Sequence, residues 1–126
     1  MSNSENGKVR SFKDLMIWQK AIELAENIYV ITKSFPDEEK YGLTIQLRRA
    51  SVSIASNIAE GFGRYYNKDY QRFLFIAIGS CAEVYTQVII AQRLDYISDS
   101  SAESILTRSD EISKMTRGLI NKLKNK

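Results

Sequence analysis

The sequence LTIQLRRASVSIASNIAEG, residues 43–61, carries two patterns of side chains with helical spacing. One is apolar, recurs every three or four residues and fits a helix face turned toward a core; its members are Leu43, Leu47, Ala50, Ile54 and Ile58. A polar line with the same spacing runs beside it, made of Gln46, Arg49, Ser53, Asn57, Glu60 and Arg64. The stretch therefore predicts an amphipathic helix in a helical protein.

Helical periodicity continues on both sides of this stretch, and a few residues mark where it is interrupted. Pro36 disfavours helical geometry in the residue before it, and Gly61 and Gly63 are typical of a helix end. Serines and aspartates can cap a helix start, as at Ser11 and Ser98. Four helices are expected, over residues 11–35, 37–62, 68–94 and 102–122.

Long helices joined by short links favour antiparallel neighbours. The sequence therefore predicts an all-α fold, an antiparallel up-down-up-down four-helix bundle. Residues 1–10 are expected to form a flexible N-terminal segment, and residues 11–126 one bundle domain. Gly79 and Ser80 fall inside the expected third helix, where a glycine lowers helix propensity by about 1 kcal/mol. Close approach of a neighbouring helix explains them better than a ligand does.

Composition limits the chemistry open to the chain. Its 126 residues are 44% hydrophobic and 26% charged, as in ordinary soluble domains. There is no histidine and one cysteine, Cys81, which excludes intrachain disulfides, Cys/His zinc sites and catalytic triads. Glu60, Asp69 and Glu83 have no recognisable catalytic partner. We expect a protein that is not an enzyme, with no catalytic residues, no metal site and no cofactor.

The sequence lacks the features of a secreted or membrane protein. We identify no apolar run close to the eighteen or so residues that span a bilayer. Residues 1–10 also lack the apolar middle of a signal peptide. A cytoplasmic location without a membrane partner is expected.

Two of the expected helices carry more apolar surface than one bundle core requires. The first has two apolar stripes, and apolar side chains wrap more than half of the third. Because large exposed apolar patches are uncommon on monomers, we expect a homo-oligomer. The alternative is that irregular helix crossing hides the surplus within one chain. The residues expected in the oligomer interface are Ile17, Leu24, Ile28, Ile31, Phe75 and Ile78.

Positive charge is concentrated at a few places, although the net charge is only +3. Arginines of the second helix and cations that begin the third are interleaved with Tyr65, Tyr66 and Tyr70, as in proteins that bind single-stranded nucleic acid. Cations also gather at the end of the fourth helix, where the helix dipole alone favours them. The nucleic-acid-binding residues expected are Arg48, Arg49, Arg64, Lys68, Arg72, Lys122 and Lys124. The competing interpretation is a solvated face in which Glu60 pairs with Arg64.

Several separated stretches form a more specific pattern. They follow one another over roughly residues 11–95 and are FKDLMIWQKA (12–21), Phe35-Pro36, YGL (41–43), QLRRA (46–50), SIASNIAEG (53–61) and AIGSCAE (77–83). In these stretches the chain resembles the bacterial four-helix bundle proteins encoded by intervening sequences in 23S ribosomal RNA genes. Ala55 departs from the proline that is frequent at that point of the family pattern.

The resemblance implies an antiparallel four-helix bundle that assembles as a ring, commonly a pentamer. It also implies kinship with the accessory protein of diversity-generating retroelements, a basic pentamer that binds nucleic acid and a reverse transcriptase. Two functions follow as hypotheses. The first is binding of RNA or DNA through backbone phosphates, with little sequence preference. The second is a protein-interaction scaffold that docks a nucleic-acid enzyme such as a reverse transcriptase.

Overall fold

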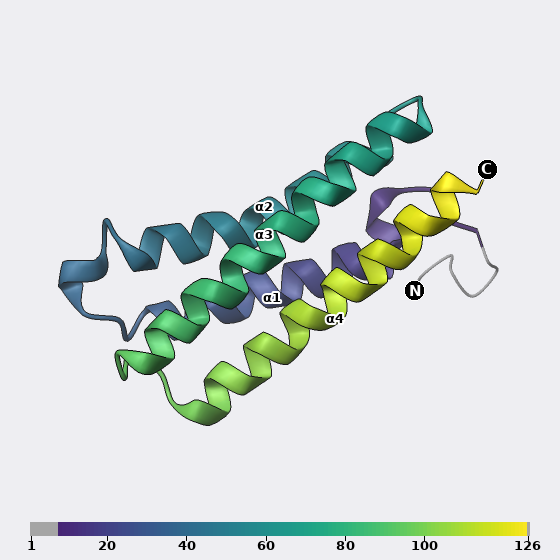
Figure 1. Cartoon of the computed structure of the whole chain (residues 1–126). Coiled ribbons are helices and arrows are strands. Elements are labelled where there is room, and N and C mark those ends of the chain that lie inside the picture. The colour runs from purple at the N-terminus through teal and green to yellow at the C-terminus, as the bar shows by residue number, and fades with distance from the viewer. Residues whose placement is uncertain (1–7, 126) are drawn as a thin grey trace.

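The structure, a computed structural model, describes residues 8–125 of the chain, and in this range it contains helices and no strand (Figure 1). Each long helix contacts the next along the chain, and α1 also contacts α4, so the bundle closes with α1 diagonally opposite α3. The predicted all-α, antiparallel four-helix bundle is confirmed. The helices are α1 (Met16–Thr32), α2 (Leu43–Phe62), α3 (Asn67–Arg93) and α4 (Asp99–Lys124), with short 3-10 turns η2 (Phe12–Asp14) and η3 (Asp37–Glu39) before α1 and α2.

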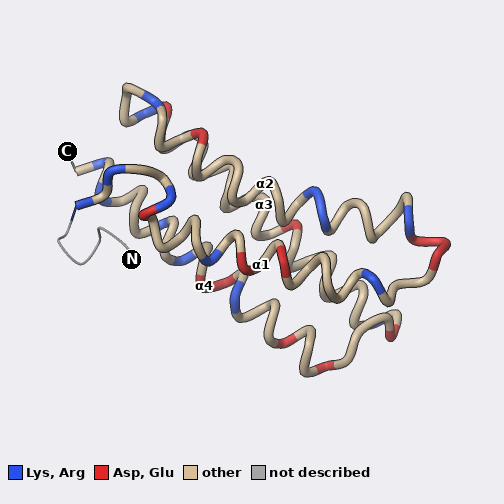
Figure 2. Tube along the Cα trace, turned by 180° about the vertical axis from the view of Figure 1, so that it is seen from behind, with Lys and Arg blue, Asp and Glu red and all other residues tan. Residues whose placement is uncertain are grey.

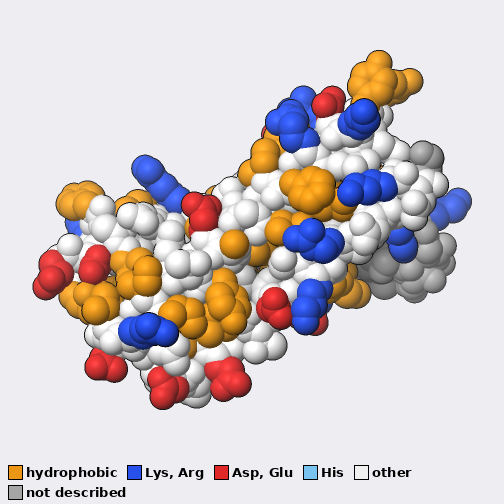
Figure 3. Space-filling view, in the orientation of Figure 1, with side chains coloured by type: hydrophobic (Ala, Val, Ile, Leu, Met, Phe, Trp, Pro, Cys, Tyr) orange, Lys and Arg blue, Asp and Glu red, His pale blue; other side chains and the backbone are white. Residues whose placement is uncertain are grey.

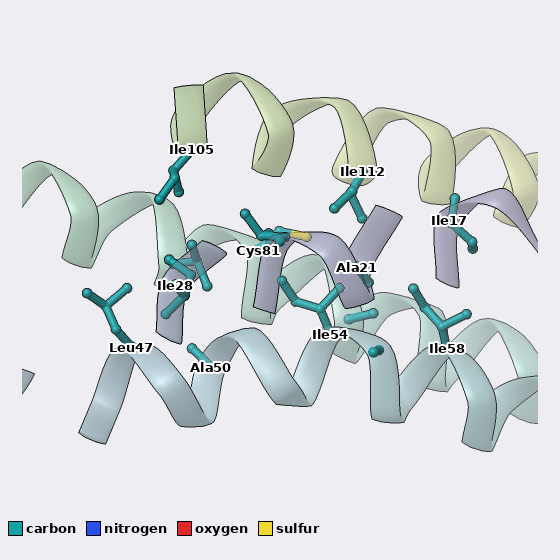
Figure 4. Close-up of a cluster of buried hydrophobic side chains, with 14 of the residues drawn as sticks. Ile17, Ala21, Ile28, Leu47, Ala50, Ile54, Ile58, Cys81, Ile105 and Ile112 are labelled. Atoms are coloured by element: carbon teal, nitrogen blue, oxygen red, sulfur yellow. The ribbon is translucent and has the colours of Figure 1, made fainter. Parts of the chain in front are cut away.

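The core is built mainly from branched aliphatic side chains of all four helices (Figure 4). Leu24, Ile28, Leu47 and Ile54 are fully buried. Cys81 is 2% exposed and belongs to this core, as the sequence predicts. Burial raises the pKa of its thiol to about 11. The Ser109 hydroxyl donates to the Cys81 carbonyl oxygen at 3.0 Å, which ties α4 to α3 inside the bundle.

The expected start of the first helix is wrong by several residues. Ser11 caps η2 instead of α1: its hydroxyl accepts from the Lys13 N–H at 3.2 Å, and its own N–H donates to Asp14 Oδ2 at 3.2 Å. Leu15 is extended, with ψ 127°, and separates this turn from α1. Of the segment expected to be flexible, residues 1–7 lie outside the described range, and the Arg10 N–H donates to Asp14 Oδ2 at 3.0 Å.

The second helix also begins later than predicted, because the three acids after Pro36 form the separate turn η3. Glu39 still serves α2. Its Oε1 accepts from the Leu43 N–H at 3.0 Å, and its Oε2 accepts from the Tyr96 hydroxyl at 2.9 Å. Both bonds favour the ionised carboxylate and lower the pKa of Glu39. One side chain thus caps α2 and joins it to the link between α3 and α4.

Replacing Glu39 with glutamine is expected to destabilise the bundle at neutral pH. The folded protein lowers the pKa of Glu39 below its ordinary value of 4.5, so the ionised group adds stability above that pH. This contribution disappears as the pH falls through the folded-state pKa. Urea unfolding of wild type and Glu39→Gln between pH 7 and pH 3 should show midpoints that converge in acid. The matched control is Glu38→Gln, and a constant midpoint difference across this range would contradict the assignment.

One helix in the described part of the chain, α3, is long and apolar enough to cross a membrane by length and composition alone, with a mean hydropathy of 1.8 over 18 residues. The sequence interpretation that no such stretch exists is therefore wrong. The same test is passed by core helices of soluble bundles, and α3 packs against both α2 and α4. Only a third of its apolar window is buried in the bundle.

Candidate nucleic-acid interface

Charge is distributed unevenly along the bundle axis (Figures 2 and 3). At one end, the link between α2 and α3 lies beside the end of α4, where Asn67 Nδ2 donates to the Leu123 carbonyl oxygen at 3.5 Å. The carboxylates nearest in sequence to the cations gathered there are Glu60 and Asp69. We call this group of cations the basic end; it consists of Arg64, Lys68, Arg72, Arg117, Lys122 and Lys124.

The opposite end is acidic. It is formed by η3 and by the link between α3 and α4, which the bond between Tyr96 and Glu39 holds together. Three cations, Lys33, Lys40 and Arg93, accompany the acids in this region. The acids are Asp37, Glu38, Glu39, Asp95, Asp99 and Glu103. A polyanion is therefore attracted to one end of the molecule and repelled from the other.

Two arginines of the basic end are held against one aromatic ring. The guanidinium carbons of Arg64 and Arg72 lie 4.6 and 4.5 Å from the centroid of Phe73. Arg64 Nη2 also pairs with Glu60 Oε2 at 2.6 Å, which confirms the predicted i,i+4 pair. Arginine forks that are already ordered lose less entropy when they bind a phosphate.

The tyrosines of this end divide into two kinds. Tyr65 and Tyr66 are 89% and 66% exposed, and their rings meet edge to face with centroids 4.8 Å apart. Exposed rings beside cations offer surfaces on which bases stack. The ring centroid of Tyr70 lies 6.1 Å from that of Phe62, and burial raises the pKa of the Tyr70 hydroxyl to about 12. Tyr70 is therefore a packing residue.

Two of the predicted binding arginines do not join the basic end. Arg48 donates from Nε to Thr32 Oγ1 at 2.9 Å, and its guanidinium lies 4.6 Å from the Tyr29 ring, so it fastens α2 to the end of α1. Arg49 is exposed and borders a polar hollow of about 300 Å³ between α2 and α3. Arg49 precedes Arg64 by fifteen residues, or about 22 Å of helix. The expected continuous strip is thus divided in two.

The middle of the polar line on α2 faces α3. Asn57 Nδ2 donates to the carbonyl oxygen and the hydroxyl of Ser53, both at 2.9 Å. The Ser80 hydroxyl donates to the Ser53 hydroxyl, also at 2.9 Å. Ser53 therefore joins α2 to α3, whereas the bonds of Asn57 stay within α2.

The predicted interface residues also separate into two groups. Ile17, Leu24 and Ile28 are 5%, 0% and 0% exposed, so their assignment to an interface between copies is wrong: the chain's own core already buries them. The remaining three keep accessible surface. Ile31 and Ile78 are half-buried, and Phe75 is 44% exposed with the Lys124 ammonium 5.7 Å from its ring centroid.

Sequence reasoning did not assign Arg117 to the site. It is exposed and precedes Lys124 by seven residues, two helical turns, so both cations lie on one side of α4. That spacing was the available signal. Within residues 8–125 no group of three or more Cys, Asp or Glu side chains is placed to hold a metal ion.

Comparison with known proteins gives consistent results. A family model described as 23S rRNA-intervening sequence protein matches residues 13–118. The chain is also similar to a protein with unknown function from the S23 ribosomal protein family of Bacteroides thetaiotaomicron VPI-5482, which has a crystal structure. The two sequences are 28% identical, and the two structures superpose with a TM-score of 0.78. The alignment covers 83% of this chain and 98% of that one. No curated protein matches the chain.

Proposed function

Since the chain belongs to the family of 23S rRNA-intervening sequence proteins, we propose that it is a cytoplasmic, non-enzymatic homo-oligomer that binds RNA or DNA phosphates through its basic end. The favoured assembly is a pentameric ring. The matched crystal structure is described as a protein of unknown function, so the proposal rests on this chain's own residues.

The observation that carries the proposal is the gathering of exposed cations at one end, most of which form no ion pair among the described residues. Among the ion pairs of residues 8–125, Arg64 is the only member of the basic end that takes part. Lys68, Lys122 and Arg117 are exposed and remain available to phosphates. Tyr65 and Tyr66 add stacking surface beside them.

Binding of this kind is electrostatic and depends little on base sequence. Each neutralised phosphate releases counterions, so affinity falls as the salt concentration rises. A ring with its subunits in the same orientation places equivalent basic ends on one face. Avidity then offsets the small net charge of one chain.

Replacing Lys68, Lys122 and Lys124 together with alanine is expected to weaken nucleic-acid binding roughly 10- to 100-fold at low salt. The slope of log affinity against log salt should fall in magnitude by about 2 for single strands and about 3 for duplex DNA. Filter binding to structured RNA and to single-stranded DNA across a salt series measures both quantities.

The matched control is the triple alanine replacement of Lys33, Lys40 and Arg93, which removes the same charge from the acidic end. It should leave the salt slope close to wild type. If the two triple variants lost equal affinity for nucleic acid, this would contradict a site localised at the basic end. Absence of wild-type binding even at low salt would overturn the proposal and favour the scaffold hypothesis.

A further inference from the structure

A polar hollow lies between α2 and α3, which run side by side (Figures 1 and 2). Its volume is about 300 Å³, which is at the lower end of the range of small-molecule sites. Among the described residues that line it, none is aromatic, so a molecule held there is recognised by hydrogen bonds and charge rather than by stacking. We call it the α2–α3 hollow; it is lined by Gln46, Arg49, Ala50, Ser53, Glu83 and Gln87.

Three polar groups of the hollow lack partners within residues 8–125. Arg49 and Glu83 are exposed, and neither takes part in an ion pair. Gln87 Oε1 is buried and accepts no hydrogen bond. The bond that the Gln87 side chain does make, from Nε2 to Gln46 Oε1, is long at 3.5 Å. Because a buried acceptor without a partner is unfavourable, a ligand that brings an N–H group to this place gains binding free energy.

Donors and acceptors stand on different walls of the hollow. Arg49 belongs to α2, and its guanidinium presents N–H groups as a planar fork. Glu83 and Gln87 lie four residues apart on α3 and therefore share one side of that helix. The carboxylate supplies two acceptor oxygens, and Gln87 Oε1 supplies a third. The arrangement suits a flat molecule that has two acceptors on one edge and neighbouring N–H donors on the next.

Guanine has this pattern among the nucleic-acid bases. Its O6 and N7 are adjacent acceptors, which an arginine binds as a pair. On the neighbouring Watson–Crick edge, the N1–H and the N2 amino group are adjacent donors. Adenine presents an amino group beside N7 instead of a second acceptor. Uracil has one N–H group on its Watson–Crick edge, and the amino group of cytosine is bordered by acceptors. Proteins read unpaired bases on these same edges.

We propose that the α2–α3 hollow binds a guanine base, with Arg49 donating to O6 and N7 and Glu83 accepting from the N1–H and the N2 amino group. Gln87 Oε1 accepts the second hydrogen of that amino group. The base belongs to a free nucleotide or to an unpaired position of a strand, and both present the same edges. Arg49 lies about 22 Å along α2 from Arg64. The hollow is therefore a second site, separate from the basic end, whose proposed phosphate contacts read no base.

Calorimetric titration with GMP and AMP tests the site. The two nucleotides carry the same phosphate, so a difference between them reports on the base. GMP should bind roughly 10- to 100-fold more tightly than AMP, the range expected when a paired contact to the base is lost. IMP keeps O6, N7 and the N1–H but lacks the N2 amino group, and its affinity should fall between the other two. Absence of GMP binding, equal affinities for GMP and AMP, or IMP bound as tightly as GMP would overturn the proposal.

Alanine at position 83 tests the wall that α3 contributes. Glu83→Ala should weaken GMP binding roughly 10-fold or more and leave AMP binding close to wild type. Position 83 is exposed and alanine favours helix, so helical circular dichroism should be retained. The matched control is Glu26→Ala, which removes an exposed carboxylate from α1 and should bind GMP like wild type. Unchanged GMP binding in Glu83→Ala, or an equal loss in both variants, would contradict a role for this carboxylate.

Two further arms identify the source of the base and separate this test from that of the basic end. A short oligouridylate with one guanine should bind more tightly than the same strand with adenine there if the base is read within a strand, and a preference shown by GMP alone assigns the site to free nucleotides. The triple alanine variant of Lys68, Lys122 and Lys124 keeps the hollow, so its preference for GMP over AMP should persist. Selective GMP binding by a protein that binds no RNA or DNA would remove the proposed phosphate-binding function and support the hollow. Strand binding with equal affinities for GMP and AMP would do the reverse.

Discussion

Replacing Ile54 with alanine is expected to lower the free energy of unfolding by about 2 to 4 kcal/mol. Ile54 is fully buried in the middle of α2 and points into the aliphatic cluster shown in Figure 4. Removing three carbon atoms loses their transfer free energy and leaves a cavity that rigid neighbouring helices fill only in part. Urea unfolding at one fixed protein concentration measures the loss, because association also contributes to stability.

A graded series makes this result specific. Ile54→Val should cost about 1 kcal/mol, and Ser56→Ala, an exposed change in the same helix, should lie within about 0.5 kcal/mol of wild type. A loss below 1 kcal/mol for Ile54→Ala would contradict the close packing of this layer.

Replacing Gly61 with valine is expected to destabilise the protein by about 3 kcal/mol and to weaken nucleic-acid binding as well. A Cβ at this position would lie 2.9 Å from Phe73 Cβ and 3.2 Å from the Tyr70 carbonyl oxygen. Backbone atoms cannot yield as a flexible side chain does, so α2 and α3 must separate here. The Phe73 ring that supports Arg64 and Arg72 then moves, which links the packing defect to the basic end.

Gly63→Ala is the matched control. The nearest atom to its added Cβ is the Glu60 carbonyl oxygen at 3.7 Å, an ordinary contact, and its φ of −80° suits any residue. It should be neutral or more stable by up to about 1 kcal/mol. Thermal unfolding and filter binding of both variants give the comparison, and a neutral Gly61→Val would show that the approach of α2 and α3 is looser than described.

Periodicity predicted the helices well, because a bundle core imposes the same three and four spacing on every member. It predicted their ends less well. Glu39 caps α2 through a bond to Leu43, and its partner Tyr96 lies far away in sequence, so local spacing could not reveal the cap. Gly61 was interpreted as a helix end but lies within α2, where its role depends on Phe73.

Only part of the candidate site could be predicted from the sequence, for a related reason. Spacing shows which residues share a helix face, but not which neighbour covers that face. On α1, the stripe containing Leu24 was expected in an interface between copies but lies in the core, whereas the stripe containing Ile22 is half-buried. Arg49 and Arg64 share a face yet lie far apart along the axis, and the fold brings Lys122 to Arg64's end of the bundle instead.

The single buried thiol gives the molecule its own reporter of opening. Cys81 is shielded on α3 beside the bond from Ser109, and its high pKa leaves almost no thiolate at neutral pH. An alkylating reagent therefore modifies it chiefly when α4 swings away or the chain unfolds. The rate at which the reagent labels the wild-type protein therefore measures how often the bundle opens, and no cysteine has to be introduced as a probe.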